Sequence, residues 1–203
     1  GLGDGWIAPA WAEAAPHRVA ATDDLGAALL FRPTRAHFSE WVQRTGRGQP
    51  VPRLVEMQAA GERDAPTYLY AWEARPEIDD LVCLFAAPHL HDFAERGDAT
   101  AIAPPRRGVA FSAHAPGPLG AAMRANHLRC VAEETPFAVV RTCHVFPEQG
   151  SAYEAIVLPV RAGTGPRADA LIGHLMPFPA ETVVAGVVPA GMPIDRGVCL
   201  ARD

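Results

Sequence analysis

His89 and His91 are the two side chains whose spacing best suits metal chemistry. In an extended segment they face the same side of the chain, and neutral imidazoles at this spacing can ligate a metal ion. Asp92 is adjacent, but no further Asp, Glu or Cys stands at a standard ligand spacing. We therefore interpret both histidines as turn or surface residues, and we expect no metal and no other cofactor.

The four cysteines, Cys83, Cys130, Cys143 and Cys199, lie far apart, form no C-x-x-C motif and sit in apolar stretches. A free cysteine in such a place behaves as a small hydrophobe. Cys143 and His144 are neighbours on a predicted strand, so they point to opposite faces and cannot form a nucleophile–base dyad. The chain also lacks G-x-S-x-G, Walker and G-x-G-x-x-G motifs. These observations favour a protein that is not an enzyme.

Several arginines could clamp an anionic ligand or partner: Arg106 and Arg107, together with Arg44, Arg47 and Arg53. We interpret them as solvated loop side chains. The formal net charge is −5, whereas a phosphate-binding surface needs a concentrated basic patch. We therefore expect no nucleic-acid partner.

No stretch of the sequence is suited to crossing a membrane. The longest apolar candidate, residues 182–194, is broken by Pro189 and Pro193 and falls short of the roughly 20 residues that span a bilayer. Residues 1–15 lack the basic start and sustained apolar core of a signal peptide. The scattered cysteines fit a reducing compartment. The sequence thus predicts a cytoplasmic protein with no membrane partner.

The second half of the chain predicts one helix followed by three strands. The helix opens at Gly117 and Pro118, carries an apolar stripe at helical spacing and ends at Thr135-Pro136. Residues 137–146, 153–160 and 170–178 then alternate between apolar and polar side chains, with short polar turns between them. This pattern indicates an antiparallel meander.

The first half is less regular. Residues 34–45 predict a helix with one apolar face formed by Phe38, Trp41 and Val42, and residues 23–31 predict a short helix. Strands are predicted at residues 51–58, 68–74, 79–87 and 109–114, of which 79–87 has the most continuous apolar run.

Together these elements resemble a PAS domain, and more closely a group of small stand-alone PAS-like proteins common in alphaproteobacteria. The pattern starts with a helix bearing an aromatic–Trp pair, then a basic Gly-rich loop and a proline, here Phe38, Trp41, Arg44, Gly46, Arg47, Gly48, Pro50 and Arg53. It ends with a P-x-x-x-x-R strand, a Tyr-led strand running into Leu-Pro, and a hydrophobic strand, here Pro136, Arg141, Tyr153, Leu158, Pro159 and residues 171–178. Residues 55–107 depart most from the pattern.

The resemblance implies an α+β fold, a PAS-like antiparallel five-stranded sheet with helices on one face and an N-terminal helical extension. The domain would span residues 34–178, between extensions at 1–33 and 179–203. The resemblance also implies a non-catalytic sensory or protein-docking role in bacterial signalling. The expected partners are a small apolar ligand, a signalling protein such as a histidine kinase, or a second copy of the chain.

The same resemblance implies a ligand between the inner face of the sheet and the helices that cross it. The residues expected to line this space are mostly apolar, namely Tyr70, Trp72, Leu84, Phe85, Met123, His127, Val139 and Ile156. An apolar wall with few polar anchors is typical of a small-molecule site. The alternative is that these side chains interlock into a solid core at ordinary packing density.

Two other functions stay open at this point. A haem-based sensor would use His127 or His174 as an axial ligand, although covalent haem attachment is excluded because no C-x-x-C-H motif exists. A small hydrolase or isomerase on an α+β scaffold would use His and Arg side chains. A polar cluster converging in a deep cavity would favour the enzyme, and the colour of the purified protein would reveal haem.

Overall fold

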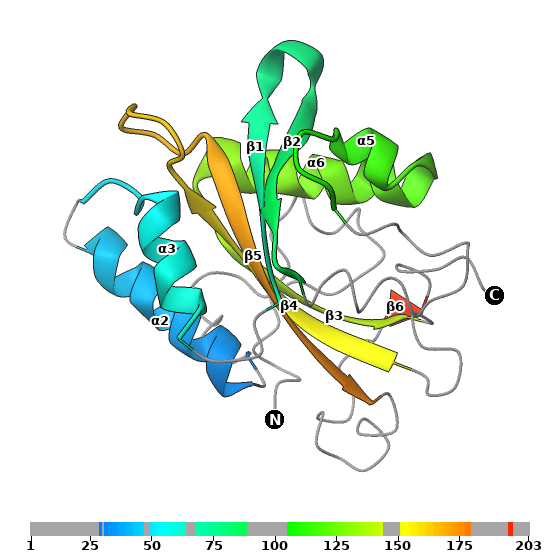
Figure 1. Ribbon diagram of the computed structural model, residues 1–203, viewed down its shortest axis with the longest axis horizontal. Helices are drawn as coiled ribbons and strands as arrows, with labels where there is room; N and C mark the ends of the chain where they lie inside the picture. The colour runs from blue at the N-terminus through cyan, green and yellow to red at the C-terminus, as the bar shows by residue number, and fades with distance from the viewer. Residues whose placement is uncertain are drawn as a thin grey trace.

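The computed structural model describes residues 29, 31–46, 49–63, 68–88, 105–143, 151–179 and 195–196 of the 203-residue chain. Their centre is a twisted sheet with the strand order β2-β1-β5-β4-β3-β6 (Figure 1). The first five strands in this order are antiparallel to their neighbours, whereas β6 pairs in parallel with β3. The strands are β1 (Leu69–Arg75), β2 (Asp80–Ala86), β3 (Phe137–Cys143), β4 (Ser151–Val160), β5 (Ala170–Pro179) and β6 (Asp195–Arg196).

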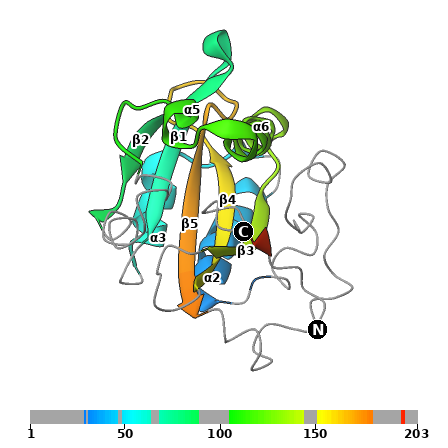
Figure 2. The same ribbon diagram turned by 90° about the vertical axis from the view of Figure 1, so that its right-hand side faces the viewer.

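Helices cover both faces of this sheet, as the two views show (Figures 1 and 2). The long helix α6 (Gly117–Glu133) and the short helix α5 (Phe111–His114) lie on one side, here called the α6 face. Helices α2 (Arg32–Thr45) and α3 (Leu54–Gly61) lie on the other side, the α2 face. A 3-10 turn, η4 (Pro76–Ile78), joins β1 to β2.

Each face buries its own apolar core, because successive side chains of a strand point to opposite sides of the sheet. On β5, Leu171 and Leu175 belong to the α6-face core, whereas Ala170 and Ile172 belong to the α2-face core. The central strands are therefore covered on both sides. Strand β2 lies at the edge of the sheet, but its side chains also reach both cores: Leu81 and Cys83 belong to the α6-face core, and Leu84 and Phe85 pack against the α2-face core. This explains the apolar run at residues 81–85.

The boundaries of α6 follow from local chemistry. Pro118 lies in its first turn, where a missing N–H costs no intrahelical bond. The helix ends at Glu134, which adopts a left-handed conformation with a φ of 54°. The Glu134 N–H donates to the Val131 carbonyl at 3.3 Å, and Pro136 follows two residues later. The predicted helix and its C-terminal stop are confirmed.

The α+β class is confirmed: five strands form an antiparallel sheet, and the long helix α6 precedes β3, β4 and β5, an arrangement consistent with the expected PAS-like fold. The three predicted meander strands, the two predicted strands at 68–74 and 79–87 and the helix at 34–45 all form. The second helical layer on the α2 face extends the expected arrangement, which had helices on one face. Phe38 and Trp41 of α2 are buried as expected, but Val42 is exposed.

Two predicted strands are wrong. Residues 51–58 mostly form helix α3, which starts after Arg53 and is capped by the Glu56 carboxylate accepting from the Arg53 N–H at 2.8 Å. Residues 109–114 make a single bridge to β2 at Ala110 and then turn into α5. The helix predicted at 23–31 falls mostly outside the described residues.

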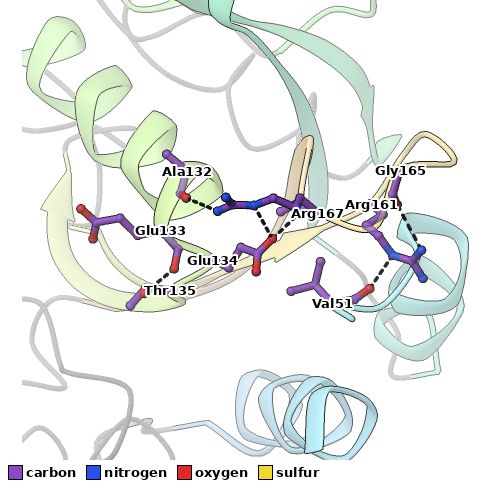
Figure 3. A network of polar contacts seen from close by, with 9 residues as sticks. Val51, Ala132, Glu133, Glu134, Thr135, Arg161, Gly165 and Arg167 are labelled. Atoms are coloured by element: carbon purple, nitrogen blue, oxygen red, sulfur yellow. Dashed lines mark hydrogen bonds and ion pairs between the residues drawn. The ribbon is translucent and has the colours of Figure 1, made fainter. Parts of the chain in front are cut away.

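The connection between β4 and β5 touches both helical layers (Figure 3). On one side, Arg161 Nε donates to the Val51 carbonyl at 2.7 Å, just before α3. On the other, Arg167 Nη2 donates to the Ala132 carbonyl at 3.0 Å, and Glu134 Oε1 accepts from the Ala168 N–H at 2.9 Å, both at the end of α6. Among the described residues, none of the helices has the length and apolarity to cross a membrane.

Candidate ligand site

Five of the residues expected to line a ligand site do lie together on the α6 face. Trp72 and Val139 are buried in its core, and Tyr70 and Met123 pack against it. His127 lies between the rings of core aromatic residues. These side chains come from β1, β3 and α6, so the sheet and the long helix both contribute to the group.

The other expected residues lie on the α2 face. Ile156 is buried there because its neighbours on β4, Ala155 and Val157, take the α6 face. Leu84 and Phe85 also pack against the α2-face core, because the pairing of β1 with β2 shifts by one residue after Ala71. The structure therefore does not bring Ile156, Leu84 and Phe85 to the same site as Trp72 and His127.

A connected set of rings lies beneath α5 and α6, and we call it the ring cluster: Trp72, Phe111, His114, His127 and Phe137. The ring centroids of Trp72 and Phe111 are 5.0 Å apart, and those of Phe111 and His127 are 5.3 Å apart. His127 meets Phe137 edge-on at 5.6 Å, and His114 lies 5.4 Å from Trp72. Aromatic rings at these separations attract one another beyond their area burial.

Phe111 and His114 were not predicted as site residues. Both belong to α5, whereas the sequence predicts a short strand or extended piece there. The aromatic–imidazole pair three residues apart could have indicated them, since positions i and i+3 share one side of a helix. Phe111 is buried and stands between the Trp72 and His127 rings, so α5 connects the β1 and α6 parts of the cluster.

Hydrogen bonding fixes the orientation of the His127 ring. Its Nδ1 atom lies 2.6 Å from the Met123 carbonyl, one helical turn earlier. A carbonyl oxygen only accepts, so Nδ1 carries the proton and, in the neutral ring, Nε2 is the acceptor atom. The buried His127 side chain thus adds a polar atom of defined character to an aromatic wall.

Asp80 anchors α5 to the start of β2. Its carboxylate accepts from the Ser112 Oγ hydroxyl at 2.6 Å and from the Leu81 N–H at 2.8 Å. Arg124 of α6 lies 4.0 Å from the same carboxylate. Through these contacts, the Asp80 carboxylate links β2 to both helices that cover the ring cluster.

The described cysteines are unsuited to nucleophilic chemistry. Cys83 and Cys130 are free and buried. Burial raises the pKa of the Cys83 thiol to about 11, and burial together with nearby Glu133 raises the pKa of the Cys130 thiol further. Both therefore stay protonated at neutral pH and act as small core hydrophobes, as the sequence indicated.

The candidate metal and haem ligands do not lie together in the described part of the chain. There, no three His, Cys, Asp or Glu side chains come close enough together to hold a metal ion. His89 and His91 lie outside the described residues. His127 and His174, each proposed as a single axial ligand, face opposite sides of the sheet, next to Phe111 and His37 respectively.

The described arginines that could clamp an anion do not converge on one site. Arg44 pairs with Glu40 at 2.7 Å and with Glu56 at 3.5 Å on the α2 side. Arg106 and Arg107 are exposed in the turn before α5. Arg47 lies outside the described residues. Arg53, Arg106 and Arg107 are exposed, as interpreted, whereas the interpretation of Arg44 as a solvated loop side chain is wrong, because it lies in helix α2 and pairs with two glutamates.

No family model matches the chain, and no curated protein is similar to it. A search of solved structures finds a structure described as an RNA-binding light-oxygen-voltage receptor. The two are 18% identical, the match covers 61% of this chain and 32% of that one, and the TM-score is 0.36. This chain therefore spans about a third of that receptor, and a likeness of this degree carries no argument about ligand or partner.

Proposed function

We propose that this chain is a non-catalytic, PAS-like sensory domain that holds a small, flat, largely apolar ligand at the ring cluster. The observation that carries the proposal is the connected set of three aromatic rings and two imidazoles beneath α5 and α6. Aromatic faces accept flat ligands, and a few fixed polar atoms such as those of His127 give orientation.

The covering helices supply a route from ligand to signal. α5 has only four residues and is held to β2 by Asp80, and α6 carries His127 and Met123. A ligand entering among the rings would shift these helices relative to the sheet. We propose that residues 34–178 form the sensory unit, and that a signalling protein such as a histidine kinase, or a second copy of the chain, receives the signal.

The same geometry favours binding over catalysis. Asp80 accepts bonds from Ser112 and Leu81, and both described thiols are buried with raised pKa values. An acid–base catalyst must reach a proton of its substrate, whereas the Asp80 carboxylate accepts bonds from the protein's own atoms and the two thiols are buried and protonated at neutral pH. We therefore propose a cytoplasmic sensor rather than a hydrolase or isomerase.

Native mass spectrometry of the full chain purified from cells tests the proposal, because it reports any bound small molecule directly. Met123→Trp places an indole against the ring cluster, and Ala125→Trp places the same group on the exposed side of α6. If a ligand occupies the cluster, Met123→Trp abolishes the bound mass with little change in stability, and Ala125→Trp retains it.

A solid core gives the opposite result. Met123→Trp would then overfill the packing and lower the free energy of unfolding by about 1–3 kcal/mol. Such a loss, together with wild-type protein that never carries a bound mass, would contradict the ligand and leave a docking module as the function.

A further inference from the structure

Two imidazoles are buried against each other on the α2 face, away from the ring cluster. His37 comes from α2 and His174 from β5, and their exposed fractions are 2% and 1%. The ring centroids are 5.3 Å apart, with the ring planes at 67° to each other. This pair lies where the helical layer formed by α2 and α3 meets the sheet.

Only one of the four ring nitrogens of the pair has a hydrogen-bond partner among the described residues. His37 Nε2 lies 2.9 Å from the Met57 carbonyl of α3, so Nε2 carries a proton and donates it. His37 Nδ1 and both nitrogens of His174 have no hydrogen-bond partner among the described residues. Buried polar atoms without partners are costly, and a charged ring in the same place would be far costlier.

The walls around the pair are close and apolar. Leu69 of β1 is directly opposite His174, and an added Cβ on Gly61 of α3 would lie 3.2 Å from His37 Cε1 and 2.9 Å from Leu69. Neither ring can therefore reach water while α2 and α3 rest on the sheet.

The charged groups on the surrounding elements do not pair with either ring. Three of them have partners of their own: Glu56 of α3 with Arg44, Glu73 of β1 with Arg75, and Glu154 of β4 with Thr34. Glu40, one turn from His37 on α2, pairs with Arg44 and favours the charged form of His37 only weakly. Protonation would therefore leave a buried charge without a close counter-ion.

We propose that the His37–His174 pair is an acid-sensitive latch that holds the α2–α3 layer on the sheet while both rings are neutral and releases it when either is protonated. Release would let the charged ring hydrate. It would also break the bond from His37 to Met57 and uncover the apolar face of α2. The inference does not depend on the ligand at the ring cluster, because it concerns the other face.

The direction of the pH effect follows from the titration of the two rings. Burial lowers the pKa of His174 to about 4, and burial together with His174 lowers the pKa of His37 to about 3. In the open form each pKa returns toward about 6.5. The closed form is therefore fully favoured above pH 6.5 and loses stability as the pH falls below it. The opening constant is the equilibrium constant for release of the α2–α3 layer from the sheet. Each ring that becomes hydrated on release should raise it about 30-fold between pH 7.5 and pH 5.

Hydrogen–deuterium exchange of the full chain, corrected for intrinsic exchange rates, tests the latch. We expect the opening constant of α2 to rise at least tenfold between pH 7.5 and pH 5, while that of α6 changes much less. In the double variant His37→Gln, His174→Met, which cannot titrate at these positions, the response of α2 should disappear. An α2 that is insensitive to pH, equal responses of α2 and α6, or an unchanged response in the double variant would each overturn the proposal.

A second measurement needs no variant. Nuclear magnetic resonance titration of the wild-type imidazoles should show both rings neutral for as long as α2 stays protected. A ring that titrates near pH 6.5 with α2 still protected would overturn the latch even if the double variant failed to fold.

Discussion

Glu154 is a fully buried carboxyl group whose Oε1 atom meets the start of α2. It accepts from the Phe31 N–H at 3.3 Å and from the Thr34 hydroxyl. The first N–H groups of a helix have no partner within the helix, and a negative charge is favoured near them. One side chain on β4 therefore holds the start of a helix more than 100 residues away in the sequence.

We expect Glu154→Ala to lower the free energy of unfolding by about 1–3 kcal/mol, because it removes the Glu154 acceptor from the Phe31 N–H and leaves the Thr34 hydroxyl with only the Phe31 carbonyl, 2.9 Å away. Glu154→Gln should cost less, since an amide oxygen can still accept. Urea unfolding at pH 7.5 measures both. Glu62→Ala is the matched control, because Glu62 is exposed, and surface changes usually stay within about 0.5 kcal/mol. Equal effects of Glu154→Ala and Glu62→Ala would contradict this role.

Individual residues also show which part of the candidate site could not be predicted from the sequence. The resemblance to a PAS domain, applied to the predicted elements, led us to expect Trp72, Met123, His127 and Val139 at one site. Assigning Ile156 to the same site requires the register of β3 with β4, which pairs Ala138 with Ile156. A shift of one residue exchanges the two faces of a strand, and sequence alternation alone does not fix which face meets α6.

Helices α5 and α6 meet through their backbones. A Cβ added to Gly120 of α6 would lie 1.7 Å from the carbonyl oxygen of Ala115, directly after α5. A backbone atom cannot move aside as a side chain can, so this crossing requires glycine. The close approach keeps α5 over the ring cluster.

We expect Gly120→Ala to lower the free energy of unfolding by about 1–3 kcal/mol through overpacking, although alanine favours a helix by up to about 1 kcal/mol. Gly46→Ala is the control, because nothing lies within 4 Å of its added Cβ and its φ of −61° suits alanine. Thermal unfolding of the two variants checks the difference. An unchanged or raised melting temperature for Gly120→Ala would show that α5 does not rest on α6 as described.

At the scale of elements, the long patterns were predictable and the short ones were not. Residues 137–143, 151–160 and 170–179 alternate over enough positions to define strands, and α6 carries a clear stop. Helix α3 has eight residues and α5 has four. Apolar runs of this length fit a helix or a strand equally well, and packing against the sheet decides between them.

The turn between β4 and β5 holds the two helical layers to the sheet at once (Figure 3). Arg161 donates a hydrogen bond to the Val51 carbonyl, just before α3, and Arg167 donates one to the Ala132 carbonyl, near the end of α6. The two contacts differ in exposure, because the Arg161 side is part-buried, whereas the Arg167 side chain is 73% exposed.

We expect Arg161→Met to lower the free energy of unfolding by about 0.5–1.5 kcal/mol, because it removes a hydrogen bond to a buried residue. Arg167→Met should have an effect near zero, because Arg167 is exposed and its ion pair with Glu134, at 3.4 Å, contributes little. Both variants keep a similar aliphatic length and can be compared by urea unfolding. A larger loss from Arg167→Met would contradict this ranking of the two contacts.

Both edges of the sheet are partly occupied by the chain itself. The short strand β6 pairs with Arg141 and Thr142 on β3. At the other edge, the Cys83 N–H donates to Val109 and its carbonyl accepts from Gly108. Open strand edges are the usual templates for aggregation and for strand addition by a foreign peptide. At these positions the backbone groups of the edge strands are already paired, so neither polymerisation through the sheet nor strand addition by a second protein can use them.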